Sequence, residues 1–272
     1  MSEQQKIVLD AKSVLAKIKE SYQNNDKLTK KANFLIYGKP RCGKTYLLRT
    51  APGPILIHSF DPGGTRTLKE ELDSGKIMME SFEQEDAQKP HAFTDWERRF
   101  NELGKAGVFD TLGTYVIDSF TFMQSALLNE IARKHMIKGQ ASKGILVDGL
   151  LQSDYGDSHT YIKHVFNQVL NLPCNVILTA HMTMDKDETD GKIYQNLMAP
   201  GQAKTFLPAM FDLYLFLKVT NTSAGAKRTL LTTADGLHDC GSRIGVGKLE
   251  KEEVCDIRQI LKKAGYPYED KV

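Results

Sequence analysis

The chain has 272 residues, of which 41% are hydrophobic and 26% charged, a composition typical of a globular protein with a sizeable core. The formal net charge is only +2, so the overall charge of the chain does not indicate nucleic acid as a partner. A local basic patch is still compatible with this charge. No apolar run approaches the roughly 18 residues of a membrane span, and the N-terminal sequence lacks the apolar core of a signal peptide. The four cysteines show no C-x-x-C or zinc-finger spacing. We therefore expect a soluble cytoplasmic protein with reduced thiols.

Residues 1–32 differ in pattern from the rest of the chain and are expected to form an N-terminal helical arm. Val14, Leu15, Ile18 and Tyr22 share one face of the expected helix, and lysines lie opposite. Two interpretations stay open: a helix packed on the flank of its own domain, and an arm that docks on a neighbouring subunit.

From residue 33 onward, short apolar runs alternate with longer amphipathic ones. Strands are expected at 33–37, 54–59, 76–82, 114–119, 175–181, 213–219 and 228–233. Helices are expected at 44–50, 94–106, 120–135, 154–171 and 250–264, with Thr94 and Asp95 capping the second. The least ordered stretches are expected at 138–150 and 183–204.

Continuous β-branched runs such as YVID and NVILT suit strands buried on both faces, which is typical of parallel sheets. The alternation predicts an α/β fold with a mainly parallel central sheet flanked by helices, and antiparallel edge strands near the C-terminus. We expect one core domain over residues 33–249, followed by a C-terminal helix and tail over 250–272.

The stretch FLIYGKPRCGKTYLL carries the spacing G-x-x-x-x-G-K-T between an expected strand and an expected helix. In such a P-loop the glycines let backbone N–H groups turn inward around phosphates. Lys44 is expected to reach the β- and γ-phosphates, and the Thr45 hydroxyl to ligate Mg²⁺. The sequence therefore predicts ATP and Mg²⁺ as cofactors. The expected nucleotide-binding residues are Gly38, Lys39, Pro40, Arg41, Cys42, Gly43, Lys44, Thr45 and Tyr46.

Polar residues stand at the ends of three other expected strands. Asp118 follows YVI and is expected to support the Mg²⁺ shell. Ser119 comes next, where many P-loop motors have a catalytic Glu, so the water-activating group must lie elsewhere or hydrolysis must be slow. Asp61, before Pro-Gly-Gly, is a candidate to orient or deprotonate water, or else a turn residue. His181 is a candidate sensor of the γ-phosphate, or else a structural histidine.

The order of these motifs resembles the RecA-like, core-only ATPases of bacteriophages, a group that includes single-strand annealing and recombination proteins. The resemblance covers roughly residues 33–245, and its more specific elements are Asp61-Pro-Gly-Gly, Tyr155-Gly156 and Leu178-Thr-Ala-His181. It implies a RecA-type sheet with Asp61 as catalytic acid, where recombinases more often have Glu. It also implies that His181 replaces a sensor that is often Gln, and it places the protein in the host cytoplasm if phage-encoded.

The resemblance further implies two loops that touch single-stranded DNA, near 134–150 and 182–204, with a single-strand-binding protein as a further possible partner. The segment 133–143 carries four cations and no acid, which suits backbone phosphates: Arg133, Lys134, Lys138 and Lys143. The second loop offers Lys204 but also a run of acids, so a solvated loop is an equal alternative. DNA binding thus depends more on the resemblance than on charge.

Arg243 lies near where RecA-like assemblies send basic residues into a neighbour's nucleotide site. A residue of that kind works only in an oligomer, so it predicts a ring or filament of identical subunits with ATP between them. A solvated surface cation is the alternative.

The sequence thus predicts a Mg²⁺-dependent ATPase that acts on single-stranded DNA in phage recombination, annealing or replication. Three other classes stay open. An AAA+-type helicase loader would carry Asp-Glu in place of Asp118-Ser119 and a helical lid where 213–233 predicts strands. A small-molecule kinase would need an acceptor site and an arginine-bearing lid, and the arginines of the sequence do not cluster into such a lid. A nucleotide-binding switch with little turnover would fit the choice of Asp61.

Overall fold

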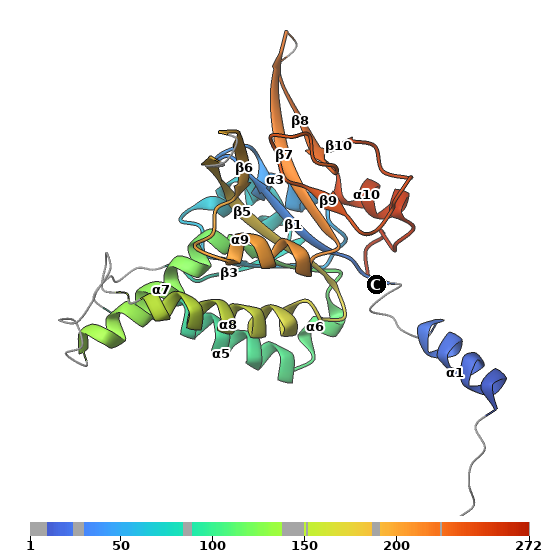
Figure 1. The fold of residues 1–272 in the computed structure, drawn as a ribbon, viewed down its shortest axis with the longest axis horizontal. Helices are drawn as coiled ribbons and strands as arrows, with labels where there is room; N and C mark the ends of the chain where they lie inside the picture. Colours follow the sequence, from blue (N-terminus) through green and yellow to red (C-terminus); the bar gives the residue numbers. More distant parts are fainter. Residues whose placement is uncertain are drawn as a thin grey trace, which may run out of the picture.

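The computed structural model describes residues 10–23, 30–83, 89–137, 150, 152–186, 191–223 and 225–271. These residues build one ten-stranded sheet, with helices on both faces (Figure 1). Its strands are, in spatial order, β10 (Glu252–Val254), β8 (Gly225–Leu231), β7 (Leu213–Thr222), β1 (Asn33–Gly38), β5 (Asn175–Lys186), β4 (Thr114–Asp118), β2 (Ile55–Ser59) and β3 (Ile77–Ser81). Off this path, β6 (Ile193–Leu197) pairs with β5 and β9 (Gly241–Ser242) pairs with β7.

The strands from β7 to β3 are parallel, whereas β8, β9, β10 and β6 pair antiparallel with their neighbours. Every residue of β1, β2 and β4 is buried, as expected for strands covered on both faces. The predicted fold class is confirmed: a mainly parallel α/β sheet flanked by helices, with antiparallel strands near the C-terminus.

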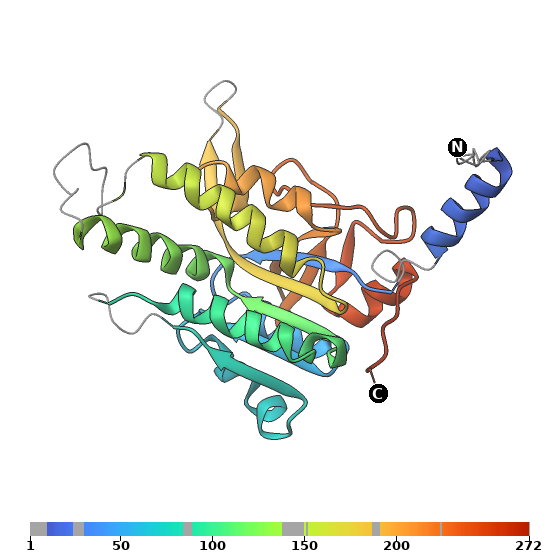
Figure 2. The same cartoon turned by 90° about the horizontal axis from the view of Figure 1, so that it is seen from below.

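Two apolar layers cover the sheet. Helices α5 (Ala92–Lys105), α7 (Phe120–Ile137) and α8 (Gln152–Val169) lie together on one face (Figure 2) and pack around Trp96 and Phe166. On the other face, α3 (Lys44–Leu47) and α10 (Ile257–Ala264) enclose a second cluster with Leu48 and Ile260. The expected C-terminal helix is therefore part of the core packing.

Shorter elements connect these layers. They are the helices α4 (Lys69–Asp73), α6 (Val108–Thr111) and α9 (Ala203–Phe206), with 3₁₀ turns at Leu48–Thr50, Gly64–Leu68 and Pro208–Met210. No helix within the described ranges is long and apolar enough to span a membrane.

All seven expected strands are present, but several expected boundaries are wrong. Helix α5 begins at Ala92, so Thr94 and Asp95 do not cap it. Instead, the backbone N–H and hydroxyl of Thr94 donate to the Glu130 carboxylate on α7. The expected helix at 250–264 begins only at Ile257, with Asp256 as its N-cap, because 252–254 joins the sheet as β10.

The expectation of a poorly ordered segment at 183–204 is also wrong in its described part. Strand β5 continues to Lys186 and pairs with β6, from Met182 opposite Leu197 to Lys186 opposite Ile193. The other such segment, 138–150, lies outside the described residues except for Leu150.

Helix α1 (Ala11–Gln23) projects away from the rest of the molecule (Figures 1 and 2). Its apolar residues Leu15, Ile18 and Tyr22 are 65%, 58% and 59% exposed. The structure therefore does not support the interpretation that this helix packs on the flank of its own domain.

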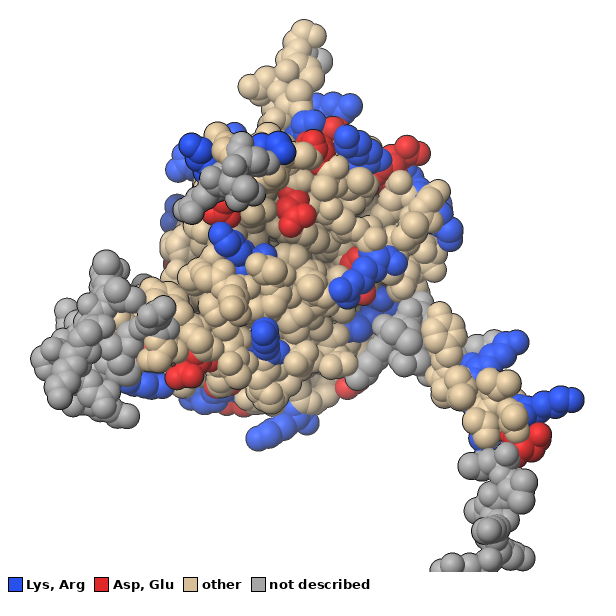
Figure 3. All heavy atoms as spheres, viewed as in Figure 1, with Lys and Arg blue, Asp and Glu red and all other residues tan. Residues whose placement is uncertain are grey.

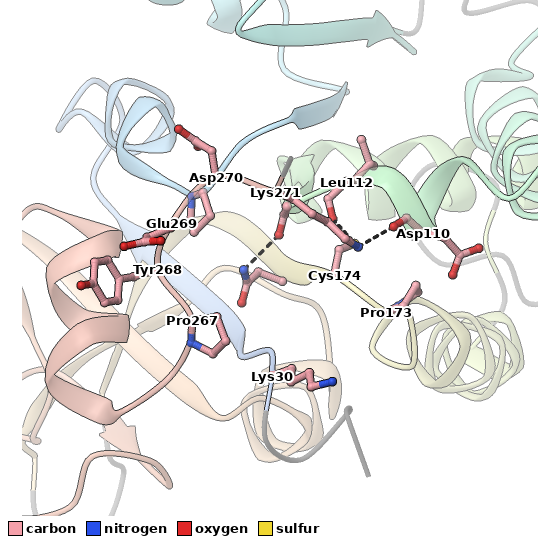
Figure 4. A pocket seen from close by; sticks show the side chains of 13 residues that line it. Lys30, Asp110, Leu112, Pro173, Cys174, Pro267, Tyr268, Glu269, Asp270 and Lys271 are labelled. Carbon is pink, nitrogen blue, oxygen red and sulfur yellow. Dashed lines mark hydrogen bonds between the residues drawn. The ribbon is translucent and has the colours of Figure 1, made fainter. Parts of the chain in front are cut away.

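The C-terminal tail crosses the amino-terminal edge of the sheet, where Lys271 N donates to Gly53 O (2.7 Å) and Lys271 Nζ to Leu112 O (3.4 Å). It walls a cavity of about 620 Å³ together with Cys174 and Asn175 (Figure 4). This cavity lies at the edge opposite the P-loop.

Candidate nucleotide-binding site

The P-loop leaves β1 at Gly38 and enters α3 at Lys44. Two residues of the loop adopt left-handed conformations, Arg41 with φ 60° and Gly43 with φ 108°. Glycine suits the second position for two reasons: that φ strains other residues, and an added Cβ would lie 3.1 Å from Nε of Arg228. The backbone conformation that the motif predicts is therefore present.

The Lys44 side chain is buried and turned back onto the loop. Its Nζ donates to the carbonyl oxygens of Gly38 (3.1 Å) and Lys39 (3.0 Å). These are neutral acceptors, and phosphate oxygens form stronger, charge-assisted bonds with an ammonium group. The geometry thus holds the Lys44 cation where a phosphate can compete for it.

The Cys42 side chain takes no part in the cleft. It is 5% exposed, lies beneath Gly38, and burial raises the pKa of its thiol. The contribution of Cys42 is its carbonyl oxygen, which accepts a hydrogen bond from Arg228 Nε (2.9 Å).

Thr45 and Asp118 meet at the base of the loop. Asp118 is fully buried, its Oδ2 accepts from the Thr45 hydroxyl (2.7 Å), and its Oδ1 accepts from the Thr179 hydroxyl. Burial raises the pKa of Asp118, and the hydrogen bonds from Thr179 and Thr45 act in the opposite direction. A buried carboxylate next to a hydroxyl is a donor pair suited to Mg²⁺.

The fit to Mg²⁺ is consistent with the rest of the site. Among the described residues there is no group of three or more His, Cys, Asp or Glu that could hold a metal ion. Mg²⁺ typically takes one or two protein ligands and completes its shell with phosphate and water. Thr45 and Asp118 would hold the ion in that way.

Asp61 and His181 come together above Asp118. Phe60 N (2.7 Å) and Asp61 N (3.3 Å) both donate to Asp118 O, so the loop after β2 bends over the end of β4. This brings Asp61 Oδ2 to 3.6 Å from His181 Nε2. Gly64 lets the loop turn tightly, since an added Cβ there would lie 3.2 Å from that of Asp61.

His181 is held by its backbone and leaves its ring free. Its N–H donates to the Thr121 hydroxyl (3.0 Å), and its ring packs edge-on against Phe122. Within the described part of the chain, neither ring nitrogen has a hydrogen-bond partner. The His181 side chain is 13% exposed at the cleft, and its ring nitrogens can accept or donate a hydrogen bond to a ligand beside the 3.6 Å approach to Asp61.

One cleft of about 1190 Å³ extends from Asp61 and His181 across the P-loop to Arg228. Its lining includes the predicted residues Lys44 and Thr45 but not Gly38, Lys39, Cys42 or Asp118. Several residues that line this cleft were not predicted from the sequence. They include Arg66, Thr67, Thr121, Phe122, Met198 and Arg228. Three arginines line this cleft: Arg41, Arg66 and Arg228. Arg228 is 186 residues from Cys42 in the sequence, so its place in the cleft becomes evident only once the pairing of β8 in the sheet is known.

Other predicted residues lie away from the cleft. Arg243 donates through Nη2 to Ala209 O and does not line the cleft of its own chain. Arg133 and Lys134 lie near the end of α7, and Lys204 forms an ion pair with Asp185 (2.9 Å). Lys138 and Lys143 lie outside the described residues.

A P-loop at the carboxyl end of a central parallel strand, with a Thr–Asp pair suited to Mg²⁺, defines a P-loop nucleotide-binding domain. The comparison with protein families agrees. Residues 30–244 match the model of a family described as AAA domain, and the chain belongs to that family.

No curated protein matches the sequence. One solved structure that is similar is the KaiC-like protein PH0186 of Pyrococcus horikoshii OT3, at 14% identity and a TM-score of 0.40, covering 76% of this chain and 83% of that one. Another is the flagellar accessory protein FlaH of Methanocaldococcus jannaschii, at 9% identity and a TM-score of 0.37, covering 75% of this chain and 78% of that one.

Proposed function

We propose that this protein is a Mg²⁺-dependent ATPase in which Asp61 activates water. One observation carries the proposal: Asp61 is the only carboxylate among the described residues that line the cleft, and its Oδ2 faces His181. Ser119, the position after Asp118, offers only a buried hydroxyl. A carboxylate at the cleft surface can orient or deprotonate an attacking water.

Each residue then has a role in hydrolysis. Lys44 exchanges its carbonyl partners for phosphate oxygens and offsets their charge. Thr45 and Asp118 would hold Mg²⁺, which would supply charge stabilisation to the phosphates. Asp61 takes the proton of the attacking water, and His181 binds an oxygen of the terminal phosphate next to it.

We further propose that the ATPase acts on single-stranded DNA in recombination, annealing or replication, as the resemblance to phage RecA-like ATPases implies. Its contact surface would include the β5–β6 hairpin, which begins directly after His181. Met184 and Ile193 on this hairpin are 59% and 54% exposed, and apolar side chains of this kind can pack on unstacked bases. Lys204 offsets the negative charge of Asp185 in an ion pair, and Asn196 Nδ2 donates a hydrogen bond to the same carboxylate. This ion pair weakens the repulsion that Asp185 would exert on a DNA backbone.

Cations at the end of α7 would add contacts with the DNA backbone. This helix extends beyond the carboxyl edge of the sheet, in a different direction from the hairpin (Figure 2), and carries Arg133 and Lys134. Basic and acidic side chains are interspersed over the face in Figure 3, without an extended patch of one sign. Local contacts rather than an overall field would therefore hold the DNA.

The proposal includes a homo-oligomer, a ring or filament with ATP between subunits. Arg243 would then reach the nucleotide cleft of a neighbouring copy. The exposed apolar face of α1 would dock on the surface of a neighbouring copy. The proposed division is an arm over 1–32, an ATPase core over 33–249 and a C-terminal helix and tail over 250–272.

The test is the ATPase rate with and without single-stranded DNA, for wild type and Lys44→Ala. We expect DNA-stimulated turnover that Lys44→Ala abolishes. Replacing Arg133 and Lys134 by Ala should weaken DNA binding and reduce its salt dependence by about one unit of log–log slope per lost phosphate contact. Lys105→Ala, an exposed cation at the end of α5, is the matched control. A wild-type protein that binds no ATP would overturn the whole proposal.

A low-turnover nucleotide switch is the second candidate. The shorter Asp61 in place of Glu and its approach to His181 favour it. ATP binding with turnover that ignores DNA would support this candidate over a DNA-dependent ATPase. An AAA+-type loader is less favoured, because strands β7 and β8 occupy the region where its helical lid would lie.

A further inference from the structure

Arg228 on β8 contacts the P-loop of its own chain. Its Nε donates to Cys42 O (2.9 Å), and its Nε and Cδ lie 3.1 and 3.3 Å from where a Cβ of Gly43 would be. The side chain also lines the cleft. The Arg228 side chain thus covers the left-handed Gly43, the last residue of the loop before α3.

The sheet places Arg228 on the opposite side of the P-loop from the catalytic candidates. Strand β1 carries the loop, with β5, β4 and β2 to one side and β7 and β8 to the other. His181 and Asp61 follow strands on the first side. Arg228 lies in the middle of β8, on the second side, opposite Val219 of β7.

This arrangement orients a nucleotide in the cleft. Its terminal phosphate must face Asp61 if that carboxylate is to act on the attacking water. The nucleoside end of the phosphate chain must then extend toward Arg228. The present acceptor of Arg228, a peptide carbonyl, is neutral, whereas a phosphate oxygen forms a stronger, charge-assisted bond with a guanidinium.

We propose that Arg228 binds the α- and β-phosphates of a nucleoside di- or triphosphate in cis, on the P-loop of its own chain. The inference rests on the proposed nucleotide binding but not on hydrolysis or DNA. It differs from the role proposed for Arg243, which needs a second copy. Arg228 is a binding residue at the end of the nucleotide remote from Asp61.

The β7–β8 hairpin that carries Arg228 is then linked to nucleotide occupancy. Beyond Arg228 this hairpin is exposed on both strands and projects from the molecule (Figure 1). A nucleotide that binds Arg228 restrains the hairpin midway along its ladder, where Arg228 pairs with Val219.

Binding of ADP and ATP to purified wild type and variants, measured by calorimetry, tests the proposal. Arg228→Ala should lower the affinity for both nucleotides by the same factor, about tenfold, the loss expected for a charge-assisted hydrogen bond. Arg228→Lys should recover part of it. Lys227→Ala, the preceding exposed cation on β8, should bind as wild type does. Thermal melting without nucleotide shows that each variant is folded.

Two results would overturn the assignment. Unchanged affinity in a folded Arg228→Ala would make the contact with Cys42 purely structural, and a loss for ATP but not ADP would move Arg228 to the γ-phosphate. Wild type that binds neither nucleotide would instead overturn the proposed function.

One further measurement reports the restraint of the hairpin by the nucleotide, and a second distinguishes a role of Arg228 in cis from a role in trans. ADP should slow amide hydrogen exchange at Val219 in wild type but not in Arg228→Ala. Mixing Arg228→Ala with Lys44→Ala should restore no ADP binding of wild-type affinity, since neither chain then has an intact site. Recovery above the sum of the separate variants would place Arg228 in trans and contradict the proposal.

Discussion

His181 Nε2 lies 3.6 Å from Asp61 Oδ2, although the strands that lead to these residues are not neighbours in the sheet. Strand β4 separates them, and its final residue is the buried Asp118. The loop after β2 crosses the end of β4 through two hydrogen bonds to Asp118 O. Asp118, the carboxylate suited to Mg²⁺, therefore lies beneath this loop. Asp61 and His181, which are suited to water and phosphate, lie on its cleft side.

Asp61→Asn keeps the shape of the side chain and removes its basicity. ATP affinity should change little, whereas the turnover rate should fall by about 10²–10⁴-fold, the usual contribution of a general base. Steady-state ATPase assays combined with calorimetric ATP binding measure both quantities. Asp95→Asn on the exposed surface of α5 is the control. A rate equal to wild type would remove Asp61 from the mechanism.

His181→Phe keeps an aromatic ring near Phe122 and removes both ring nitrogens. We expect the turnover rate to fall at least tenfold with ATP affinity within about threefold, because the loss of a hydrogen bond to a charged group costs about 1.5–3 kcal/mol. His181→Gln, which restores a donor and an acceptor, should recover part of the rate. Single-turnover assays report the chemical step, with the exposed His164→Ala on α8 as control. Equal rates in Phe and Gln variants would indicate a packing role only.

Asp118→Asn should separate stability from function. The fully buried carboxylate is costly to desolvate, so the neutral amide should stabilise the nucleotide-free protein by on the order of 1 kcal/mol. The same change should abolish the gain in ATP affinity that Mg²⁺ provides. Thermal melting and ATP titrations with and without Mg²⁺ test the two parts. Retained Mg²⁺ dependence would exclude Asp118 as the ligand.

His58 should make folding sensitive to acid. It is fully buried on β2, where burial lowers its pKa to about 4, against the opposing effect of Glu80. The Trp96 indole donates to Tyr115 Oη (3.1 Å), and Tyr115 lies 2.8 Å from His58 Nδ1, which leaves that nitrogen as an acceptor. A neutral His58 is therefore the form that the fold accommodates.

The direction of this pH dependence is set by proton binding to His58. Between pH 6.5 and 4 the unfolded chain binds the His58 proton and the folded chain does not, so this contribution to stability is complete above pH 6.5 and is lost as the pH falls. The loss amounts to about 3 kcal/mol by pH 4. Urea unfolding at pH 7, 5.5 and 4.5 should show a steeper loss in wild type than in His58→Gln. The exposed His91→Gln is the control, and equal slopes in all three proteins would contradict the assignment.

The strand-end residues were predictable because parallel strands of one sheet bring their carboxyl ends to one edge. Asp61, Asp118 and His181 each follow a buried apolar run, and a P-loop identifies the edge that matters. Their mutual geometry was not predictable, since it depends on the path of the loop over β4.

Arg228 and β6 could not be read from the sequence for a related reason. Both depend on antiparallel pairing, whose register is set by contacts between strands rather than by the pattern within either one. The start of α5 was misplaced because Thr94, which resembles a cap, is bound by Glu130 from another helix.

Strand β5 belongs to two pairings in succession. His181 lies opposite Gly38, the first residue of the P-loop, and the next residue, Met182, is already paired with Leu197 of β6. The Tyr37 hydroxyl, one residue before the loop, lies 3.0 Å from Gln195 O on the same hairpin. The β5–β6 hairpin therefore continues directly from the cleft residue His181, with no loop between them. Because β5 carries both His181 and the hairpin, the two would move together as a rigid unit. A small shift of His181 toward a phosphate would therefore displace the solvent-exposed tip of the hairpin by a larger distance.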